Sequence, residues 1–350
     1  MIGHDHRNQR SSSAECALIS LEATPYYHTI SRCVRRAFLC GEDSLTGKSY
    51  EHRKQWVITR LRELSDVFAI DICAYAILSN HYHLVLRINQ EQAHGWTTVQ
   101  VAERWGKLFN LPQLVAHYLR AETPSEAEAN TAKAIISEWR SRLTDISWFM
   151  RSLNEHLARQ ANIEDHCKGR FWEGRFKSQA LLDEAAVLTC MSYVDLNPVR
   201  AGVAETPEAS DFTSIQQRIR QHSETSQANK PATDLRPPLP LMPLVKQDRD
   251  PHRNAMGFIL QDYLNLVDWA GRAVREGKRG AISEDAPPIL QRLGLEPERF
   301  LEHLQGHAAT EEQTAMGRLQ RIRQVAEVFG LRFLKGSGEA RRLYVTGTVG

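Results

Sequence analysis

Two histidines separated by one residue are the first side chains whose spacing could support chemistry. His81 and His83 flank Tyr82. Alternate residues of a β-strand point to the same face, so on a strand the two imidazoles would project together and Tyr82 would point away from them. Two neighbouring imidazoles with an open side suit a divalent metal ion. A pair of structural histidines at the start of a strand would give the same pattern, and the pattern alone favours that simpler explanation.

A tyrosine and an asparagine form a second candidate pair. Tyr193 and Asn197 are four residues apart in a predicted helix, so they share one face of it. There the phenol could lie beside an amide oxygen that completes a metal site. The alternative is that Tyr193 is a core residue and that Asn197 ends the helix before Pro198.

A third candidate is a basic and aromatic stretch, Lys168 to Lys177. Basic side chains can neutralise phosphates, and aromatic rings can stack on unpaired bases. The alternative is an amphipathic strand with ordinary solvated charges. The candidate DNA-binding residues are Lys168, Arg170, Trp172, Arg175 and Lys177, together with Arg32, Arg35 and Arg36 at the end of a predicted first strand.

The elements that must position these residues are those of an α+β domain. Aromatic and β-branched residues predict strands, and apolar residues at helical spacing predict a helix between the first two strands. Such an order is typical of an antiparallel sheet with flanking helices. The predicted elements are strands at Pro25–Val34, Ala69–Leu78 and His81–Ile88, with a turn at Ser79 and Asn80, and a helix at Tyr50–Phe68.

The next part of the chain is predicted to be helical from about 97 to 162, as an insertion with a polar break at Thr123–Asn130. Strand character returns at Gly169–Leu181. Asp183 is a predicted N-cap for a helix from Glu184 to Asn197, and Pro198 lies where such a helix would stop.

The remaining sequence predicts a linker and a second, mainly helical domain. Residues 206–252 are rich in Ser, Gln, Pro and charge, which is typical of a linker, and an ordered strap over the domain surface is the alternative. We expect helices at Met256–Ala273 and in a pair within Pro297–Phe329, and a β-hairpin at Arg332–Val349. The expected division is a flexible tail (1–22), a catalytic domain (23–205), the linker (206–252) and the C-terminal domain (253–350).

Composition bounds the class of protein. The chain has 350 residues, 42% hydrophobic and 25% charged, as in ordinary soluble proteins with more than one domain. It has neither the long apolar run of a transmembrane helix nor a signal peptide, and its six cysteines are scattered, so we expect a reducing cytoplasm. The net charge of +2 is too small to argue for nucleic acid by itself.

Four blocks in this order give the chain a resemblance to a known family. The sequence resembles the single-tyrosine HUH transposases and, within them, the REP-associated tyrosine transposases. The resemblance covers about residues 25–203, and the segment 90–167 is longer than in a minimal member. The blocks are Tyr27–Arg32 (YHTISR), Ala74–Leu86 (AYAILSNHYHLVL), Gly174–Ser178 (GRFKS) and Tyr193–Gly202 (YVDLNPVRAG).

The resemblance implies a ferredoxin-like α+β core and a specific chemistry. His81 and His83 match the metal ligands, Asn197 the polar third ligand and Tyr193 the nucleophile. Magnesium or manganese would be the cofactor. The implied substrate is single-stranded DNA beside a hairpin, such as a repetitive palindromic element, cut and rejoined through a 5′-phosphotyrosine by a monomer or homodimer with no membrane partner.

Two other functions stay open at this point. A protein with the same fold could bind DNA or RNA at specific sequences without catalysis. A metal-dependent hydrolase of small phosphoesters is the other alternative, but a histidine-triad enzyme needs a third histidine further along the strand, where Val85 and Leu86 stand.

Overall fold

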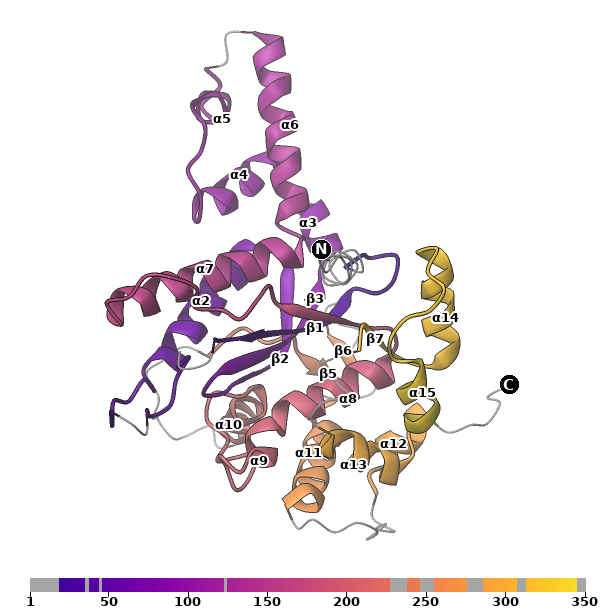
Figure 1. The fold of residues 1–350 in the computed structure, drawn as a ribbon. Helices are drawn as coiled ribbons and strands as arrows, with labels where there is room; N and C mark the ends of the chain where they lie inside the picture. Colours follow the sequence, from indigo (N-terminus) through magenta and orange to yellow (C-terminus); the bar gives the residue numbers. More distant parts are fainter. Residues whose placement is uncertain are drawn as a thin grey trace, which may run out of the picture.

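A five-stranded sheet forms the centre of the computed structural model (Figure 1). The structure describes residues 19–34, 38–43, 46–122, 125–226, 238–245, 255–275, 286–306 and 313–344, so Arg35, Arg36 and most of the expected N-terminal tail lie outside the described residues. The strand order is β2-β3-β1-β4-β7, antiparallel except that β7 runs parallel to β4. The strands are β1 (Tyr26–Arg32), β2 (Ile70–Ile77), β3 (His81–Ile88), β4 (Lys177–Leu181) and β7 (Ala315–Met316).

Helices cover both faces of this sheet. Helix α2 (Arg53–Val67), between β1 and β2, and helix α7 (Ile146–Glu164), between β3 and β4, lie on one face, and α8 (Glu184–Asp195) lies on the other (Figure 1). This order of strands and crossing helices confirms the predicted α+β class and follows the ferredoxin-like plan.

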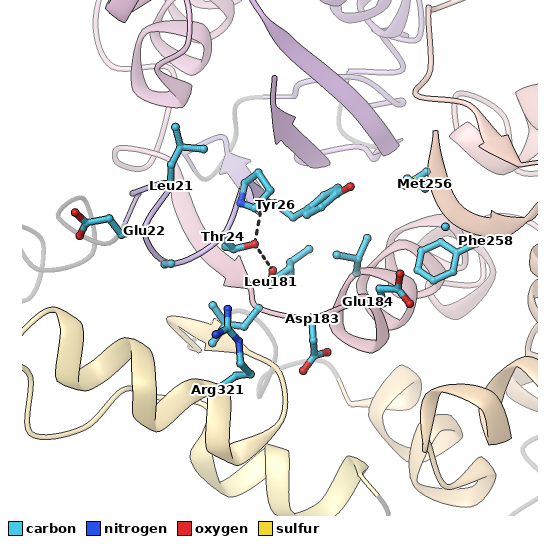
Figure 2. Close-up of a pocket in the computed structure, with 15 residues that line it drawn as sticks. Leu21, Glu22, Thr24, Tyr26, Leu181, Asp183, Glu184, Met256, Phe258 and Arg321 are labelled. Atoms are coloured by element: carbon cyan, nitrogen blue, oxygen red, sulfur yellow. Dashed lines mark hydrogen bonds between the residues drawn. The ribbon is translucent and has the colours of Figure 1, made fainter. Parts of the chain in front are cut away.

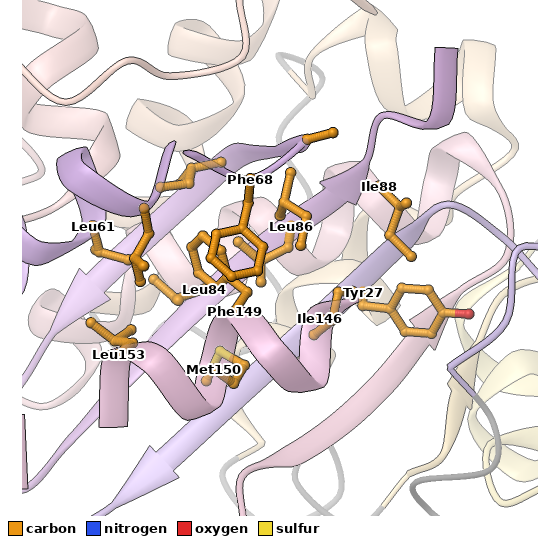
Figure 3. Close-up of a cluster of buried hydrophobic side chains, with 14 of the residues drawn as sticks. Tyr27, Leu61, Phe68, Leu84, Leu86, Ile88, Ile146, Phe149, Met150 and Leu153 are labelled. Carbon is orange, nitrogen blue, oxygen red and sulfur yellow. The ribbon is translucent and has the colours of Figure 1, made fainter. Parts of the chain in front are cut away.

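The alternation of side chains along β3 sorts them between two hydrophobic clusters. Leu84 and Leu86 point toward α2 and α7, where they meet Phe149 and Met150 (Figure 3). Val85 points the other way, into the cluster formed with α8. His83 precedes Val85 by two residues, so β3 presents it to α8.

The helices that follow β3 project away from the sheet, whereas α7, which also lies within the predicted helical insertion of 97–162, packs against it (Figure 1). The projecting helices are α3 (Gln90–Gly95), α4 (Thr98–Gly106), α5 (Gln113–Leu119) and α6 (Glu126–Arg142). Helix α6 begins inside the expected polar break because the Ser125 side chain caps it by accepting from the Glu128 N–H. Stacked indoles of Trp105 and Trp139, 5.3 Å between ring centroids, join α4 to α6.

Two predicted boundaries near the candidate residues were wrong. The strand expected from Gly169 begins only at Lys177, because the preceding loop bonds to itself: the Arg170 guanidinium donates to the carbonyl oxygens of Trp172 and Glu173. Helix α8 ends at Asp195, and Asn197 instead begins the short helix α9 (Asn197–Arg200). Pro198 lies in the first turn of α9, where a proline is tolerated.

The segment predicted as a linker contains helix α10 (Ser214–Ser226), and its described residues pack along β2. The Ser214 hydroxyl accepts from the Tyr75 N–H at 3.0 Å, and the Arg218 guanidinium donates to the Cys73 carbonyl at 2.9 Å. Met242, from the proline-rich part, donates its N–H to the Ile72 carbonyl at 2.8 Å. The described part of 206–252 therefore behaves as the ordered strap.

The C-terminal part is mainly helical but adds strand β7 to the main sheet. The residues expected to start one helix at Met256 form strand β6 (Met256–Ile259) first. The described part of the expected hairpin contains helix α15 (Ser337–Leu343), where Ala340 and Leu343 bury one helical face, and residues 345–349 lie outside the described residues. Among the described residues, no helix has the length and apolar character needed to cross a membrane. The elements are β5 (Leu244–Val245), β6 (Met256–Ile259), α11 (Leu260–Arg275), α12 (Pro288–Leu293), α13 (Pro297–Gln305), α14 (Leu319–Val328) and α15 (Ser337–Leu343).

Candidate active site

Strand β3 places the two predicted histidines on the face covered by α8. The rings of His81 and His83 have centroids 4.9 Å apart. Tyr82 points to the opposite face, where its hydroxyl donates to the Asn154 side-chain oxygen at 2.6 Å. The geometry predicted from the spacing of the two histidines is therefore present.

Helices α8 and α9 bring the predicted tyrosine and asparagine to the same histidines. Asp183 caps α8 by accepting from the Ala186 N–H at 2.9 Å, as its sequence position predicts. The Tyr193 ring lies edge-on to His83, 5.8 Å between centroids, and the Asn197 amide nitrogen lies 3.2 Å from Nε2 of His83. Residues distant in sequence thus converge from β3, α8 and α9.

A third imidazole, which our sequence analysis did not single out, completes this group. Nε2 of His28 on β1 lies 2.9 Å from Nδ1 of His83, and the two rings stack. His28 is opposite Val85 in the strand register, diagonal to His83 on the same face. The alternation along β1 could have indicated that His28 faces the same side of the sheet as His83, but not that the two rings are in contact.

Hydrogen bonds engage one ring nitrogen of each histidine among the candidate ligands. Nδ1 of His81 lies 2.6 Å from the Asn80 side-chain oxygen, and Nδ1 of His83 is held by His28. In both histidines Nδ1 is thus engaged, as in a ligating imidazole, and Nε2 of His83 faces the Asn197 amide nitrogen. A half-turn of the Asn197 amide would place its oxygen beside Nε2 of His83.

This donor set fits a divalent ion. Two imidazole nitrogens and one amide oxygen leave further positions for water or phosphate oxygens, as magnesium and manganese require. Within the described ranges, no group of three or more His, Cys, Asp or Glu side chains has a metal-holding arrangement.

Burial keeps the three imidazoles neutral. Burial lowers the pKa of His28 to about 4, and a hydrogen bond with Gln179 opposes this change. Burial also lowers the pKa of His81 to about 4, and the positive charge of Arg32 lowers it further. Burial likewise holds the pKa of His83 well below its usual value. Neutral imidazole is the form that binds a metal ion, so the two candidate ligands, His81 and His83, are in that form at neutral pH.

The site is closed over its centre and reachable at one edge. His83 is fully buried and Tyr193 is 2% exposed, whereas His81 is only partly buried. His81 begins β3 opposite Arg32 at the end of β1, and Lys177 begins β4 opposite Ile30. Two predicted DNA-binding residues therefore lie at the sheet end where His81 is accessible.

The other residues of the basic stretch continue from this edge. Lys168, Arg170 and Arg175 are exposed. Trp172, in contrast, is 9% exposed and donates its ring N–H to the Asn154 carbonyl at 2.8 Å, so in this conformation its ring is not available to stack on a base.

A buried carboxylate fixes the helix that carries Tyr193. Asp195 accepts from the Tyr263 hydroxyl at 2.5 Å, from the Ile215 N–H at 3.0 Å and from the Ser214 hydroxyl. Burial raises the pKa of Asp195 to about 6, although these donors oppose the rise. Helices α10 and α11 are thereby tied to α8 beside the candidate site.

A separate cavity of about 330 Å³ lies at the other end of α8 (Figure 2). Its lining comes from the chain before β1, the start of α8, β6 and α14, including Tyr26, Glu184, Phe258 and Arg321. None of the candidate site residues lines it. Figure 2 also shows the Thr24 hydroxyl, which donates to the Leu181 carbonyl at 2.6 Å and closes one wall.

Comparisons with known proteins add a fold-level neighbour. No family model matches the chain, and no curated protein matches it. A solved structure described as a REP-associated tyrosine transposase bound to a REP hairpin matches with 14% identity and a TM-score of 0.32, over 63% of this chain and 93% of that one.

Proposed function

We propose that the chain is a metal-dependent transposase that nicks and rejoins single-stranded DNA beside a hairpin through a covalent phosphotyrosine. One observation carries the proposal: Tyr193, His81, His83 and Asn197, each anticipated from sequence, converge on one face of β3.

Each residue has a distinct part in the proposed reaction. The Tyr193 oxygen attacks the scissile phosphorus, a bond to the 5′-phosphate forms, and the 3′ oxygen leaves with a proton. His81, His83 and Asn197 would hold the metal, which when bound supplies positive charge against the phosphate. His28 fixes the orientation and tautomer of His83. Rejoining is the same exchange with another 3′-hydroxyl, so it needs no nucleotide cofactor.

Two basic regions support a nucleic-acid substrate. The first is the exposed part of the stretch Lys168 to Lys177, next to the accessible edge at His81. The second is residues 313–344, which carry seven Arg and Lys against two Glu, a net +5 in a chain of net +2. The rest of the chain is therefore net −3, so this C-terminal surface is the better candidate to hold a DNA stem.

The test is formation of a covalent adduct. The protein is incubated with manganese and labelled hairpin DNA with single-stranded flanks taken from beside its own gene, and denaturing gels reveal any adduct. We expect a metal-dependent adduct that Tyr193→Phe abolishes and that Tyr75→Phe, at another buried tyrosine, retains.

Tight, salt-sensitive DNA binding without any adduct across the flanking sequences would instead favour the non-catalytic DNA- or RNA-binding alternative, for which the burial of Tyr193 is the specific support. Absence of both binding and adduct would contradict both functions.

A further inference from the structure

Arg200 stands over the proposed nucleophile with donors that have no acceptor. Its guanidinium carbon lies 4.2 Å from the centre of the Tyr193 ring. Its Nε and Nη1 atoms are buried, and neither has a hydrogen-bond partner among the described residues. Nη2 donates to the Gly306 carbonyl at 3.5 Å.

Such an arrangement is unusual for an arginine that serves packing alone. A buried charged group that leaves donors unpaired is destabilising, so proteins normally give it an acceptor. No carboxylate of the described residues forms an ion pair with Arg200, and its charge contributes to lowering the pKa of His83. The guanidinium therefore adds uncompensated positive charge to the candidate site.

Helix geometry explains why Arg200 lies beside Tyr193 and Asn197. Arg200 follows Tyr193 by seven residues and Asn197 by three, and both spacings bring side chains to one face of a helical segment. The chain stays close to helical through Leu196, since the Leu196 N–H donates to Ser192 and the Arg200 N–H donates to Leu196. Nucleophile, amide and guanidinium therefore lie on one face of this helical segment.

We propose that Arg200 is a further catalytic residue, which binds the non-bridging oxygens of the phosphate that Tyr193 attacks. A planar guanidinium with two free N–H donors matches two phosphate oxygens. During attack, the bond from Tyr193 forms and the bond to the 3′ oxygen breaks, while Arg200 offsets the charge on the remaining oxygens and exchanges no proton. This role rests on the proposed function above and adds an anion-binding residue to it.

The first measurement is the rate of adduct formation at saturating DNA. Arg200→Gln should slow it about 100- to 1,000-fold, as loss of a transition-state donor does elsewhere. Arg272→Gln, at an exposed arginine paired with Asp268, should leave it unchanged. Thermal unfolding of each variant separates a slow enzyme from an unfolded one. Arg200→Lys keeps the positive charge but not the paired N–H donors of the guanidinium, so its rate of adduct formation should be intermediate.

The second measurement separates phosphate binding from packing. In a Tyr193→Phe background, affinity is compared for DNA with an ordinary scissile phosphate and with a neutral methylphosphonate there, each with Arg200 and with Arg200→Gln. We expect the substitution to weaken binding of the ordinary DNA at least about fivefold more than binding of the methylphosphonate DNA.

Equal weakening of both DNAs, or an unchanged adduct rate in Arg200→Gln, would overturn the assignment while the wild-type adduct still supported the proposed function. A wild-type protein that formed no adduct would remove the proposed function itself, and this role with it.

Discussion

The hydrogen bond between His28 and His83 allows a quantitative prediction about metal binding. Replacing His28 by Phe keeps a ring in a position that is 1% exposed but removes the hydrogen-bond partner of Nδ1 of His83. The ring of His83 then loses what fixes its tautomer and direction. We expect the site to keep its fold and to bind the metal ion with lower affinity.

Two estimates give the same size for this effect. Loss of the partner that orients a ligating histidine lowers metal affinity about 10- to 100-fold, or about 1.4 to 2.7 kcal/mol. A buried N–H left without an acceptor costs about 1 to 3 kcal/mol. The 2.9 Å separation and complete burial of His83 place this bond among those whose loss is not compensated by water.

The assay is a manganese titration at pH 7.5, in which the free ion is counted by electron paramagnetic resonance. His303→Phe is the matched control, because His303 is also buried and hydrogen-bonded, to Glu339 at 2.9 Å, but lies outside the site. His28→Gln, which can still accept, should recover part of the affinity. Unchanged manganese affinity in His28→Phe, with His83→Ala abolishing binding, would refute the positioning role.

Three further predictions concern stability and DNA binding. Tyr263→Phe removes a donor from buried Asp195 and should lower the free energy of unfolding by about 1.5 to 3 kcal/mol in urea titrations, whereas no change would mean that this bond does not hold α8. The three site imidazoles have lowered pKa values, so without metal the protein should lose stability as pH falls from 6.5 toward 4, by about 1.4 kcal/mol per pH unit for each net proton taken up on unfolding. Asp195 acts in the opposite direction, because its raised pKa of about 6 lets the folded protein hold about one proton that the unfolded chain releases. A stability that does not change with pH would contradict the burial of the imidazoles. Neutralising Arg341 and Arg342 to Gln should weaken hairpin binding and reduce its salt dependence by about one unit per lost phosphate contact, and an unchanged slope would exclude this surface.

The local sequence pattern predicted the core of the fold and the orientation of His81 and His83 on β3. The alternation in His81–Ile88 fixed which side chains face α8, and the cap at Asp183 fixed where α8 begins. These features depend on a few neighbouring residues, so sequence alone could specify them. His28 obeys the same alternation, but its partner is 55 residues away and nothing local marks the contact.

Features that depend on tertiary context were not predictable in the same way. Lys168 to Phe176 has strand-like residues but folds as a loop, because the Arg170 guanidinium satisfies nearby carbonyls. Strand β7 has only two residues and exists because the free edge of β4 accepts it. The burial of Trp172 likewise follows from α7 supplying the Asn154 carbonyl as its partner.

The measurement closest to the central claim is identification of the amino acid that becomes joined to DNA. The adduct is formed with manganese, digested with protease and nuclease, and sequenced by mass spectrometry, with DNA labelled on either side of the nick. The account predicts a nucleotide attached through its 5′-phosphate to Tyr193, with a free 3′-hydroxyl on the other fragment. Attachment to another residue or through a 3′-phosphate, or nicked DNA with no attached protein, would contradict it.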